Sequence, residues 1–437
     1  MTKTYEKYKD SGVAWIGEIP SEWKVARIKN IYNERTELSE TGNERLLSVS
    51  EYYGVAPTSE KIEDNDFITR AKTLVGYKKC YKNDFVSNIM LAWKGSFGTT
   101  EYDGIVSPAY CVYKPVSTIS SRYYHYLFRT DLYKGRFKSY SKGIIDSRLR
   151  LYSPFFYLVD AIFPPLSEQQ SIASFLDEKC GEIDSLIALQ EEMITELQDY
   201  KQSVISEVVT KGLDPNVKMK DSGIEWIGEI PEGWKVYPFK SIFKTSKGLN
   251  ITKADLTEKG IPVINYGQIH SKNNPGTRII KELIRYVPEK YIASNPECLL
   301  PVGSILFADT SEDIEGCGNA VYIDQSDIIF AGYHTVVAKP NNSSNKYIAY
   351  QLLTDCWRSQ IRSVVNGIKV LSINQKFINS TSIIFPPLSE QQQIATYLDE
   401  KTQQIDTLIT LKQQKIEELK DYKKSIIYEY VTGKKKV

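Results

Sequence analysis

The sequence predicts two mixed α/β domains separated by two long helices that pair as an antiparallel coiled coil, with an internal pseudo-twofold repeat. Three observations support this fold class. Nearly identical phrases open and close each half of the 437-residue chain, dissimilar segments lie between those phrases, and a long helical pattern follows each closing phrase. Repetition over this length indicates two copies of one structural unit.

The repeated phrases set the expected domain boundaries. The opening phrase reads DSGVAWIGEIPSEWKV at 10–25 and DSGIEWIGEIPEGWKV at 221–236. The closing phrase reads FPPLSEQQSIASFLDE at 163–178 and FPPLSEQQQIATYLDE at 385–400. We therefore expect a first domain, a first long helix, a second domain and a second long helix at residues 1–165, 166–212, 213–387 and 388–437. The opening phrases carry tryptophans at matched positions, which we expect to pack this repeated framework: Trp15, Trp23, Trp226 and Trp234.

Each closing phrase contains a helix start, because Ser167 precedes Gln170, and Ser389 precedes Gln392, at the spacing of a capping box. Apolar residues then recur at steps of three and four, which is typical of a heptad seam. Pairing the two seams buries both apolar stripes, and the two-copy layout makes the pair antiparallel. The expected seam residues are Ile183, Leu186, Met193, Leu197, Tyr200 and Val204 in the first helix and Ile405, Leu408, Leu419, Tyr422 and Ile426 in the second.

The dissimilar middles have the pattern of mixed α/β structure. Short β-rich runs such as IVSPAYCVYKP, IPVINYGQI, GSILFAD and HTVVAKP alternate with Gly and Asn turns. A weaker repeat lies inside the middles, since residues 122–143 align with residues 346–367 and match Tyr123 to Tyr347 and Tyr126 to Tyr350. Its spacing suits an amphipathic helix followed by a glycine stop, so we expect both middles to share one fold.

The amino-acid composition favours an ordinary globular protein over a secreted or membrane-spanning one. Hydrophobic residues make up 41% and charged residues 25% of the chain, which is ordinary for a globular protein. The polar start predicts that no signal peptide is present, and no apolar run is long enough to cross a bilayer. Six scattered cysteines without a CxxC pair favour free thiols in a reducing cytosol. Three widely separated histidines offer little for a metal site or for acid–base chemistry.

Charge is distributed unevenly along the chain although its net value is only +1. The first middle, 21–162, holds 21 basic and 16 acidic side chains, and the second, 232–384, holds 17 and 13. The middles are therefore +5 and +4, and the repeated segments sum to −8. This modest asymmetry places positive charge in the two unlike middles, while ordinary fluctuation in composition remains an alternative explanation.

No enzyme signature is present in the sequence. P-loop, Rossmann, serine-elbow and HExxH patterns are absent, and so is the Asn/Asp-Pro-Pro-aromatic tetrapeptide of amino-methyltransferases. The acidic stretch DTSEDIEGCG has no lysine at nuclease-like spacing and reads more simply as a turn. We therefore assign no catalytic residue and no metal ligand.

Basic residues interleaved with aromatic ones indicate contacts to nucleic acid. Residues 122–150 are the richest stretch, although an amphipathic helix with a solvated cationic face has the same pattern. Gly-flanked polar loops offer close approach to a groove, and Asn and Gln suit adenine edges. The candidate DNA-binding residues are Lys94, Ser96, Thr99, Arg122, Arg136, Lys138, Lys142, Arg148 and Arg150 in the first middle and Lys247, Asn250, Tyr266, Gln268, Arg358, Arg362, Asn366 and Lys369 in the second.

The doubled order of W-I-G-x-I-P-x-x-W, a divergent α/β region, PPLSEQQ-x-I-A and a long heptad helix resembles the specificity subunit of type I restriction–modification systems. The resemblance covers the whole chain. It implies that residues about 21–165 and 232–387 are target recognition domains, each of which reads one half of a bipartite, asymmetric DNA site. It also implies that the two long helices space these domains and dock modification subunits.

The resemblance further implies a non-catalytic cytoplasmic subunit that binds no cofactor itself. In such systems S-adenosylmethionine belongs to the modification subunit, of which two are expected, and ATP with Mg²⁺ belongs to the restriction and translocase subunit. Two other hypotheses come from different classes of protein. A coiled-coil scaffold without a DNA role predicts no sequence-dependent DNA binding, and a stand-alone DNA-modifying enzyme predicts methylation or cleavage without a partner.

Overall fold

The computed structural model describes residues 3–60, 73–116, 118–325, 328–341, 346–365, 367 and 370–437. The chain forms two compact units. The first unit comprises Met1–Gln190 with Gln414–Val437, and the second comprises Glu191–Gln413. Each unit therefore contains one α/β domain and part of each long helix, and each is described by itself below.

The first domain is built on a four-stranded antiparallel sheet of order β4-β11-β8-β9. Strand pairs β5-β6, β7-β10, β1-β2 and β3-β12 flank this sheet. The strands are β1 (Tyr8–Asp10), β2 (Glu18–Pro20), β3 (Lys24–Arg27), β4 (Tyr32–Arg35), β5 (Leu47–Ser50), β6 (Gly54–Pro57), β7 (Lys78–Cys80), β8 (Phe85–Asn88), β9 (Phe97–Thr99), β10 (Gly104–Val106), β11 (Tyr110–Pro115) and β12 (Asp160–Phe163). The helices are α1 (Ser121–Phe128), α2 (Asp131–Tyr140) and α3 (Ser153–Phe156).

Aromatic side chains fill the core between this sheet and its helices. Phe85 of β8 stacks on Phe156 of α3 with ring centroids 5.6 Å apart, and Phe128 of α1 meets Phe85 edge-on at 5.4 Å. All three rings are almost fully buried. Such pairs add to the stabilisation from burial, so the core holds α1 and α3 against the sheet.

The second domain repeats this plan with its own sequence. Its four-stranded sheet has the order β16-β23-β19-β21, which corresponds strand for strand to the first sheet, beside a three-stranded sheet β18-β17-β22. The strands are β13 (Met219–Asp221), β14 (Glu229–Pro231), β15 (Lys235–Pro238), β16 (Phe243–Lys247), β17 (Ile261–Ile264), β18 (Arg285–Val287), β19 (Ile305–Ala308), β20 (Thr310–Ser311), β21 (Ala320–Tyr322), β22 (Phe330–Ala331), β23 (Thr335–Pro340), β24 (Leu371–Ser372) and β25 (Ser382–Phe385). The helices are α5 (Phe239–Ile242), α6 (Tyr266–Ile269), α7 (Lys290–Ser294), α8 (Lys346–Leu352), α9 (Asp355–Arg362) and α10 (Gln375–Ser380). The predicted mixed α/β fold of both middles is therefore confirmed.

The weaker internal repeat forms two short helices in each domain, so the prediction of one amphipathic helix was wrong. The break falls at Thr130 between α1 and α2 and at Thr354 between α8 and α9. The Oγ1 atom of each threonine donates 2.7 Å to the carbonyl three residues earlier, at Leu127 and Gln351. A threonine that binds its own backbone in this way competes with helix continuation, which explains the same break in both copies.

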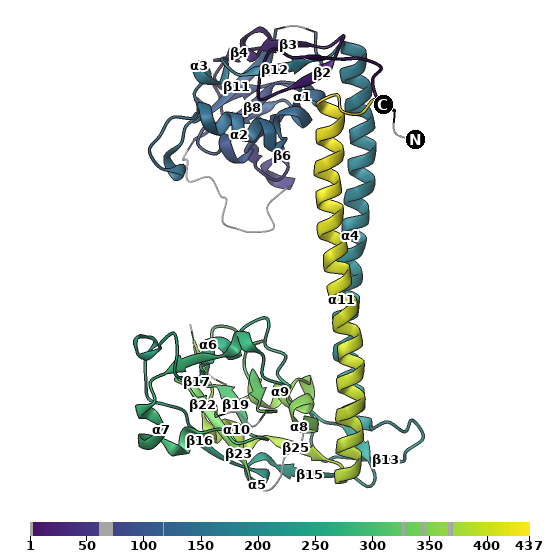
Figure 1. Ribbon diagram of the computed structural model, residues 1–437. Helices are drawn as coiled ribbons and strands as arrows, with labels where there is room; N and C mark the ends of the chain where they lie inside the picture. The colour runs from purple at the N-terminus through teal and green to yellow at the C-terminus, as the bar shows by residue number, and fades with distance from the viewer. Residues whose placement is uncertain are drawn as a thin grey trace. The chain divides into compact units, whose positions relative to one another are not determined.

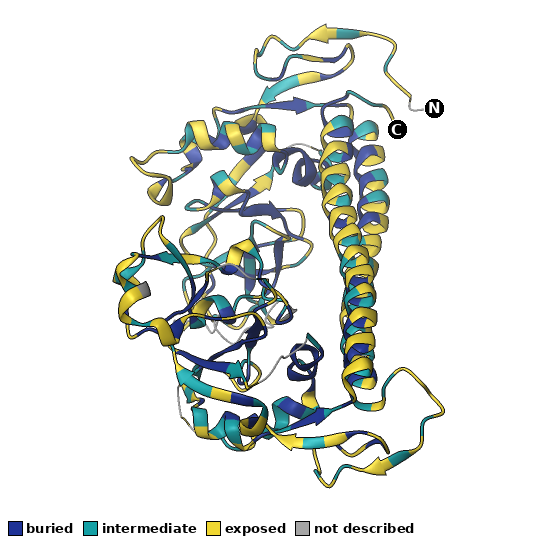
Figure 2. Ribbon diagram, turned by 60° about the horizontal axis from the view of Figure 1, so that its bottom comes forward, coloured by how far each residue is buried: buried dark blue, intermediate teal, exposed yellow. Residues whose placement is uncertain are grey.

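The two long helices, α4 (Leu166–Lys211) and α11 (Leu388–Val431), lie side by side and antiparallel in each unit (Figure 1). Both begin one residue before the predicted capping serine, so each serine lies in the first turn instead. Lys423 binds Asp184 at 2.6 Å in the first unit, and Lys201 binds Asp406 at 2.7 Å in the second. The inner strands of the four-stranded sheets, such as β8 and β19, are buried, whereas the long helices carry many exposed residues, shown in yellow in Figure 2.

The predicted heptad seam is only partly correct. Ile183, Ile405 and Ile426 are buried, and Met193, Leu197, Val204 and Leu419 are partly buried. The remaining four predicted residues are exposed, namely Leu186, Leu408, Tyr200 and Tyr422. Ile187 and Ile409 continue the seam in place of the leucines, because they lie four residues after Ile183 and Ile405. Lys201 and Lys423 lie where the tyrosines were expected, and they reach the facing helix through the two ion pairs.

Matched contacts attach each domain to the long helices. The buried hydroxyl of Tyr123 donates to the carbonyl of Val431 at 2.7 Å, and that of Tyr347 donates to the carbonyl of Val209 at 2.8 Å. Each domain thus binds the C-terminal end of a long helix in its own unit. The repeated tyrosines are therefore structural residues.

The tryptophans of the opening phrases divide into two groups. Trp23 and Trp234 are buried, and their indole N–H groups donate to Glu168 at 2.9 Å and Glu390 at 2.8 Å, at the start of α4 and α11. Trp15 is partly buried against Tyr133, with ring centroids 5.2 Å apart. Its counterpart Trp226 is half exposed, so the packing role predicted for all four residues is not confirmed there.

Candidate nucleic-acid interface

A cationic edge of the first domain carries several of the predicted DNA-binding residues. The 3-10 turn Ala92–Lys94 packs against α2, and a loop at residues 141–150 follows that helix. The Nζ atoms of Lys94 and Lys138 lie 5.3 and 4.9 Å from the centroid of the Trp93 ring. The interleaved basic and aromatic residues therefore meet as cation–π pairs, which fix the position of both amines.

The 141–150 loop is closed at its base by a small antiparallel bridge. The backbone N–H groups of Lys142 and Arg150 each donate to the other residue's carbonyl at 2.9 Å. Gly143 has a φ of 155°, and a Cβ there would lie 2.6 Å from the carbonyl oxygen of Arg148, so the turn requires glycine. Lys142 and Arg148 are exposed beside this turn. The loop therefore presents cations from a defined backbone.

Two predicted contacts of the first domain lie inside the protein. The hydroxyl of Ser96 donates to Val49 O at 3.0 Å, and that of Thr99 donates to Ser121 O at 2.9 Å. Both side chains are buried. Their hydroxyls hold strands and helix together, because a buried polar group must be hydrogen-bonded. The Gly-flanked segment was predicted to be a polar loop that approaches a groove closely, whereas Phe97–Thr99 form the strand β9.

Arg122 and Arg136 lie apart from the exposed cations. The Nε atom of Arg122 donates to Asp177 of α4 at 2.7 Å, so this residue faces the long helix. The guanidinium of Arg136 lies 4.7 Å from the ring centroid of Tyr140 and 5.3 Å from that of Trp15. Successive residues of a helix point to different sides. Basic residues that are close together in the sequence therefore do not form one patch on the surface.

Arg129 and His125 are structural residues that the sequence did not single out. Arg129 donates to the carbonyls of Glu51, Tyr52, Gly95 and Phe97 at 2.6–3.0 Å. Burial lowers the pKa of Arg129 to about 10, which leaves it charged at neutral pH. Burial, with help from nearby arginines, also lowers the pKa of His125 well below its ordinary value. His125 is thus neutral and accepts a hydrogen bond from the Thr99 amide at 3.3 Å.

In the second domain, four predicted residues surround the turn that joins β22 to β23. Lys247 ends β16, opposite Val336, and the exposed Asn250 follows it. The Tyr266 ring lies 5.7 Å from that of Tyr333 in the turn. Gln268 accepts a hydrogen bond from the Asn265 side chain at 3.2 Å. Segments separated in sequence therefore combine into one polar and aromatic surface.

His334 belongs to the same surface, although no motif in the sequence indicated it. Its ring lies 5.3 Å from that of Tyr266, and its Nδ1 lies 3.3 Å from Asp309 Oδ1. His334 has a positive φ of 54°, which non-glycine residues adopt rarely and often at functional sites. Such a backbone conformation cannot be recognised from residue type alone.

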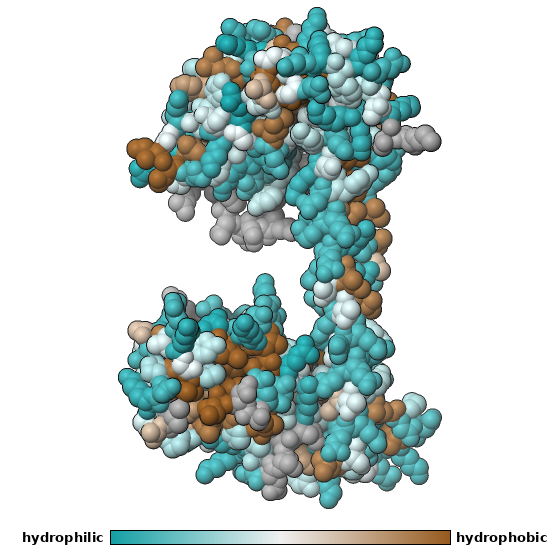
Figure 3. All heavy atoms as spheres, in the orientation of Figure 1, coloured by the Kyte–Doolittle hydropathy of each residue, from teal (hydrophilic) through white to brown (hydrophobic). Residues whose placement is uncertain are grey.

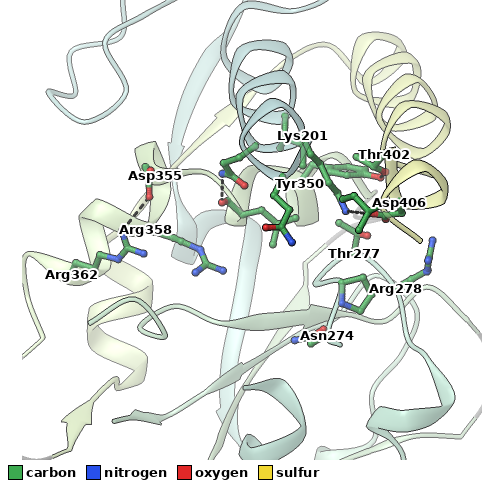
Figure 4. Close-up of a pocket in the computed structure, with 16 residues that line it drawn as sticks. Lys201, Asn274, Thr277, Arg278, Tyr350, Asp355, Arg358, Arg362, Thr402 and Asp406 are labelled. Atoms are coloured by element: carbon green, nitrogen blue, oxygen red, sulfur yellow. Dashed lines mark hydrogen bonds and ion pairs between the residues drawn. The ribbon is translucent and has the colours of Figure 1, made fainter. Parts of the chain in front are cut away.

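Arg358 and Arg362 face a cleft of about 500 Å³ within the second unit (Figure 4). Lys201 and Asp406 of the long helices lie across from them in that view. Arg358 donates to Glu315 O at 3.2 Å, and Arg362 donates to the same carbonyl at 3.3 Å and to Asp355 at 3.1 Å. Burial, together with Arg362, lowers the pKa of Arg358. Both arginines thus brace the 309–317 segment against α9.

The predicted Asn366 and Lys369 lie outside the described residues.

The described residues contain no helix that combines the length and apolarity needed to cross a membrane. Among the same residues, no group of three His, Cys, Asp or Glu side chains is arranged to hold a metal ion. All six cysteines are free, as their spacing predicted.

Comparison with known families identifies what the two domains share. The family model described as "Type I restriction modification DNA specificity domain" matches the chain twice, over residues 20–198 and 231–421. The chain belongs to this family. Each match spans one α/β domain and part of the long helix that follows it, so the repeat seen in the sequence is a repeat of the DNA specificity domain.

Curated relatives agree with the family assignment, and solved structures share the fold. The MjaVIII specificity subunit of Methanocaldococcus jannaschii is 24% identical over 394 residues, covering 87% of this chain and 86% of the relative. The EcoKI specificity subunit of Escherichia coli is 22% identical and covers 78% and 68%. The HsdS subunit of Thermoanaerobacter tengcongensis aligns with a TM-score of 0.53 at 17% identity, over 95% of this chain and 98% of that one. A chain from a type I restriction–modification assembly aligns with a TM-score of 0.69 at 15% identity, over 94% and 98%. The structural matches show the fold alone.

Proposed function

We propose that this specificity subunit binds a bipartite, asymmetric site in double-stranded DNA, with one half-site for each domain, and that it has no active site of its own. The observation that carries the proposal is the contrast between the two domains. Their sheets have the same strand order, whereas their exposed side chains differ. Two copies of one DNA specificity domain with different surfaces suit two different half-site sequences.

The residues proposed to contact DNA are those that the structure leaves accessible. In the first domain Lys94, Lys142 and Arg148 are exposed, and such cations bind phosphates or guanine edges. In the second domain Lys247 and Asn250 are exposed beside Tyr266 and Gln268, whose amide and hydroxyl groups suit base edges. Ser96, Thr99 and Arg122 are left out of the proposal, because their polar groups hold the domain interior or the long helix.

We further propose that the length of the long helices sets the gap between the two half-sites. Each domain is anchored to both helices by the matched tyrosine and tryptophan contacts. Seven residues inserted after Gln190 and again after Lys412 preserve the heptad seam and add about 10 Å of helix. The recognised gap is then expected to lengthen by about three base pairs, since each base pair occupies about 3.4 Å. Seven residues inserted at 213–217, outside the helices, serve as the control. An unchanged gap after the helix insertions would contradict the proposal.

The exposed apolar residues of the long helices are proposed to dock two modification subunits. The first unit exposes Leu186, Leu189 and Tyr422, and the second exposes Leu408, Leu411 and Tyr200, each set at the matching repeat positions. Figure 3 shows brown spheres on the surface of the long helices. Exposed apolar groups of this kind mark interaction sites. In this proposal S-adenosylmethionine belongs to the modification subunits, and ATP and Mg²⁺ belong to the restriction subunits.

Replacing Leu408 and Leu411 with aspartate tests the docking proposal. We expect the modification subunit to bind at least about tenfold more weakly, because charge replaces apolar contact at the centre of the interface. Thr407→Asp with Thr410→Asp adds the same charge to exposed neighbours on the same helix and should leave binding unchanged. Equal effects of both double variants on co-purification would contradict the proposal.

DNA reading itself is tested with the purified complex of this chain and its modification subunit. We expect sequence-dependent DNA binding and methylation that require this chain. Methylation or cleavage by this chain alone would show that it carries an active site. Absence of sequence-dependent binding by the assembled complex would instead favour a scaffold.

A further inference from the structure

We propose that the 141–150 loop of the first domain inserts Ile144 as an apolar wedge between neighbouring base pairs of bound DNA. The proposal rests on the proposed DNA-binding function and adds a mechanism to it. DNA recognition by this loop would then depend on how easily a base step unstacks, in addition to contacts with the edges of the bases.

Ile144 is the most exposed large apolar residue among those described. Its side chain is 101% exposed and that of the adjacent Ile145 is 52% exposed. The loop carries brown spheres that project from the first domain in Figure 3. Full exposure leaves the whole side chain in water, which costs free energy that burial in an apolar site recovers.

The loop is rigid enough to act as a wedge. The bridge between Lys142 and Arg150 closes its base, and Lys138 of α2 binds Asp146 within the loop at 2.8 Å. Leu149 is buried, and the amide of Leu151 donates to Ile89 O at 3.0 Å. A loop braced in this way loses little conformational entropy when it inserts, so unstacking is the main cost of insertion.

The charges around Ile144 favour a polyanion as the occupant, and the proposed function makes that polyanion DNA. Lys142, Arg148 and Arg150 are basic, and the single acidic residue of the loop, Asp146, is already paired with Lys138. Cations at the base of an apolar tip can bind phosphates on both sides of a widened step. Proteins that kink DNA combine phosphate contacts and an inserted apolar side chain in this arrangement.

The experiment compares Ile144→Ala with Leu158→Ala in the complex of full-length chain and modification subunit. Leu158 is 41% exposed in the same domain but lies outside the cationic loop, so its replacement is the matched control. The probe is the duplex that the wild-type complex methylates, with permanganate reactivity of thymines as the readout for unstacking. We expect one hyperreactive step in the first half-site with wild type and with Leu158→Ala. That reactivity should be lost with Ile144→Ala, together with about tenfold weaker binding.

Two outcomes overturn the wedge and leave the proposed function standing. The first is unchanged reactivity and affinity for Ile144→Ala. In the second outcome, Ile144→Ala weakens binding to the modification subunit, but the assembled complex binds DNA with normal affinity. Ile144 would then be a protein contact. Failure of the wild-type complex to bind or methylate any specific duplex would instead refute the proposed function. Melting temperatures of both variants establish that they fold.

Discussion

Removing the hydroxyl of Tyr347 tests how the second domain is attached to the long helices. This hydroxyl is fully buried and donates to the carbonyl of Val209 at 2.8 Å. Since α4 ends at Lys211, Val209 is among the last residues of the helix, whose carbonyls have no partner within the helix. Tyr347 therefore supplies a partner to a carbonyl that burial would otherwise leave unpaired.

The expected cost of Tyr347→Phe follows from that burial. A lost hydrogen bond that leaves a buried acceptor unsatisfied costs about 1–3 kcal/mol. For a unit of this size, a loss of about 2 kcal/mol lowers Tm by about 4–8 °C. Tyr123→Phe should have a similar cost in the first unit, because Tyr123 binds Val431 in the same way at 2.7 Å. The two costs should add, since the pairs share no partner.

Thermal and urea unfolding of the full chain measure this effect. Tyr200→Phe is the matched control, because Tyr200 lies on α4 in the same unit with an exposed side chain. We expect the control to change stability by less than about 0.5 kcal/mol. If Tyr347→Phe were as stable as the control, the hydroxyl contact would not contribute to anchoring, and the structural role assigned to the repeated tyrosines would be wrong.

Two further predictions concern charge. Because burial depresses the folded pKa of His125, its contribution to stability is complete above the unfolded pKa near 6.5 and is lost as pH falls below it. Between pH 7.5 and 5.5 the free energy of unfolding should therefore fall by on the order of 1 kcal/mol more in wild type than in His125→Ala. Equal pH dependence of the two proteins in urea titrations would contradict this. Arg148→Ala should make the negative slope of log K against log salt for DNA binding shallower by about 0.9, the value for one phosphate contact, while Ile144→Ala leaves the slope unchanged. Unaltered salt dependence of Arg148→Ala in filter-binding titrations would exclude a phosphate contact at this residue.

Much of the architecture could be predicted from the sequence, because it depends on repetition and periodicity. The two copies, the mixed α/β domains and the antiparallel helices all follow from patterns that recur at fixed spacing. The sequence does not indicate which of two neighbouring apolar residues lies in the seam between the helices. Leu186 and Ile187 are equally apolar, and only the packing of the facing helix selects Ile187 for the seam. Likewise, Tyr200 was predicted in the seam, whereas Lys201 lies there because Asp406 faces it.

The candidate DNA-binding residues were harder to predict, because exposure is a tertiary property. Lys142 and Arg148 are accessible as expected, whereas Ser96 and Thr99 are buried, and their hydroxyls bind the carbonyls of Val49 and Ser121. Ile144 is not a candidate by residue type, because isoleucine lacks the charge and the hydrogen-bonding capacity that indicate DNA contacts. Its significance depends on complete exposure among cations, and only the folded loop shows that combination.

Sequencing of methylated bases in a host that carries this chain and its modification subunit tests the central claim most directly. The proposal predicts one asymmetric motif in two parts, separated by a gap of fixed length and unspecified sequence. Exchange of residues 21–165 for those of another specificity subunit should change one part of the motif and leave the other part and the gap intact. A single continuous motif, or a change in both parts after that exchange, would contradict the claim that each domain reads its own half-site.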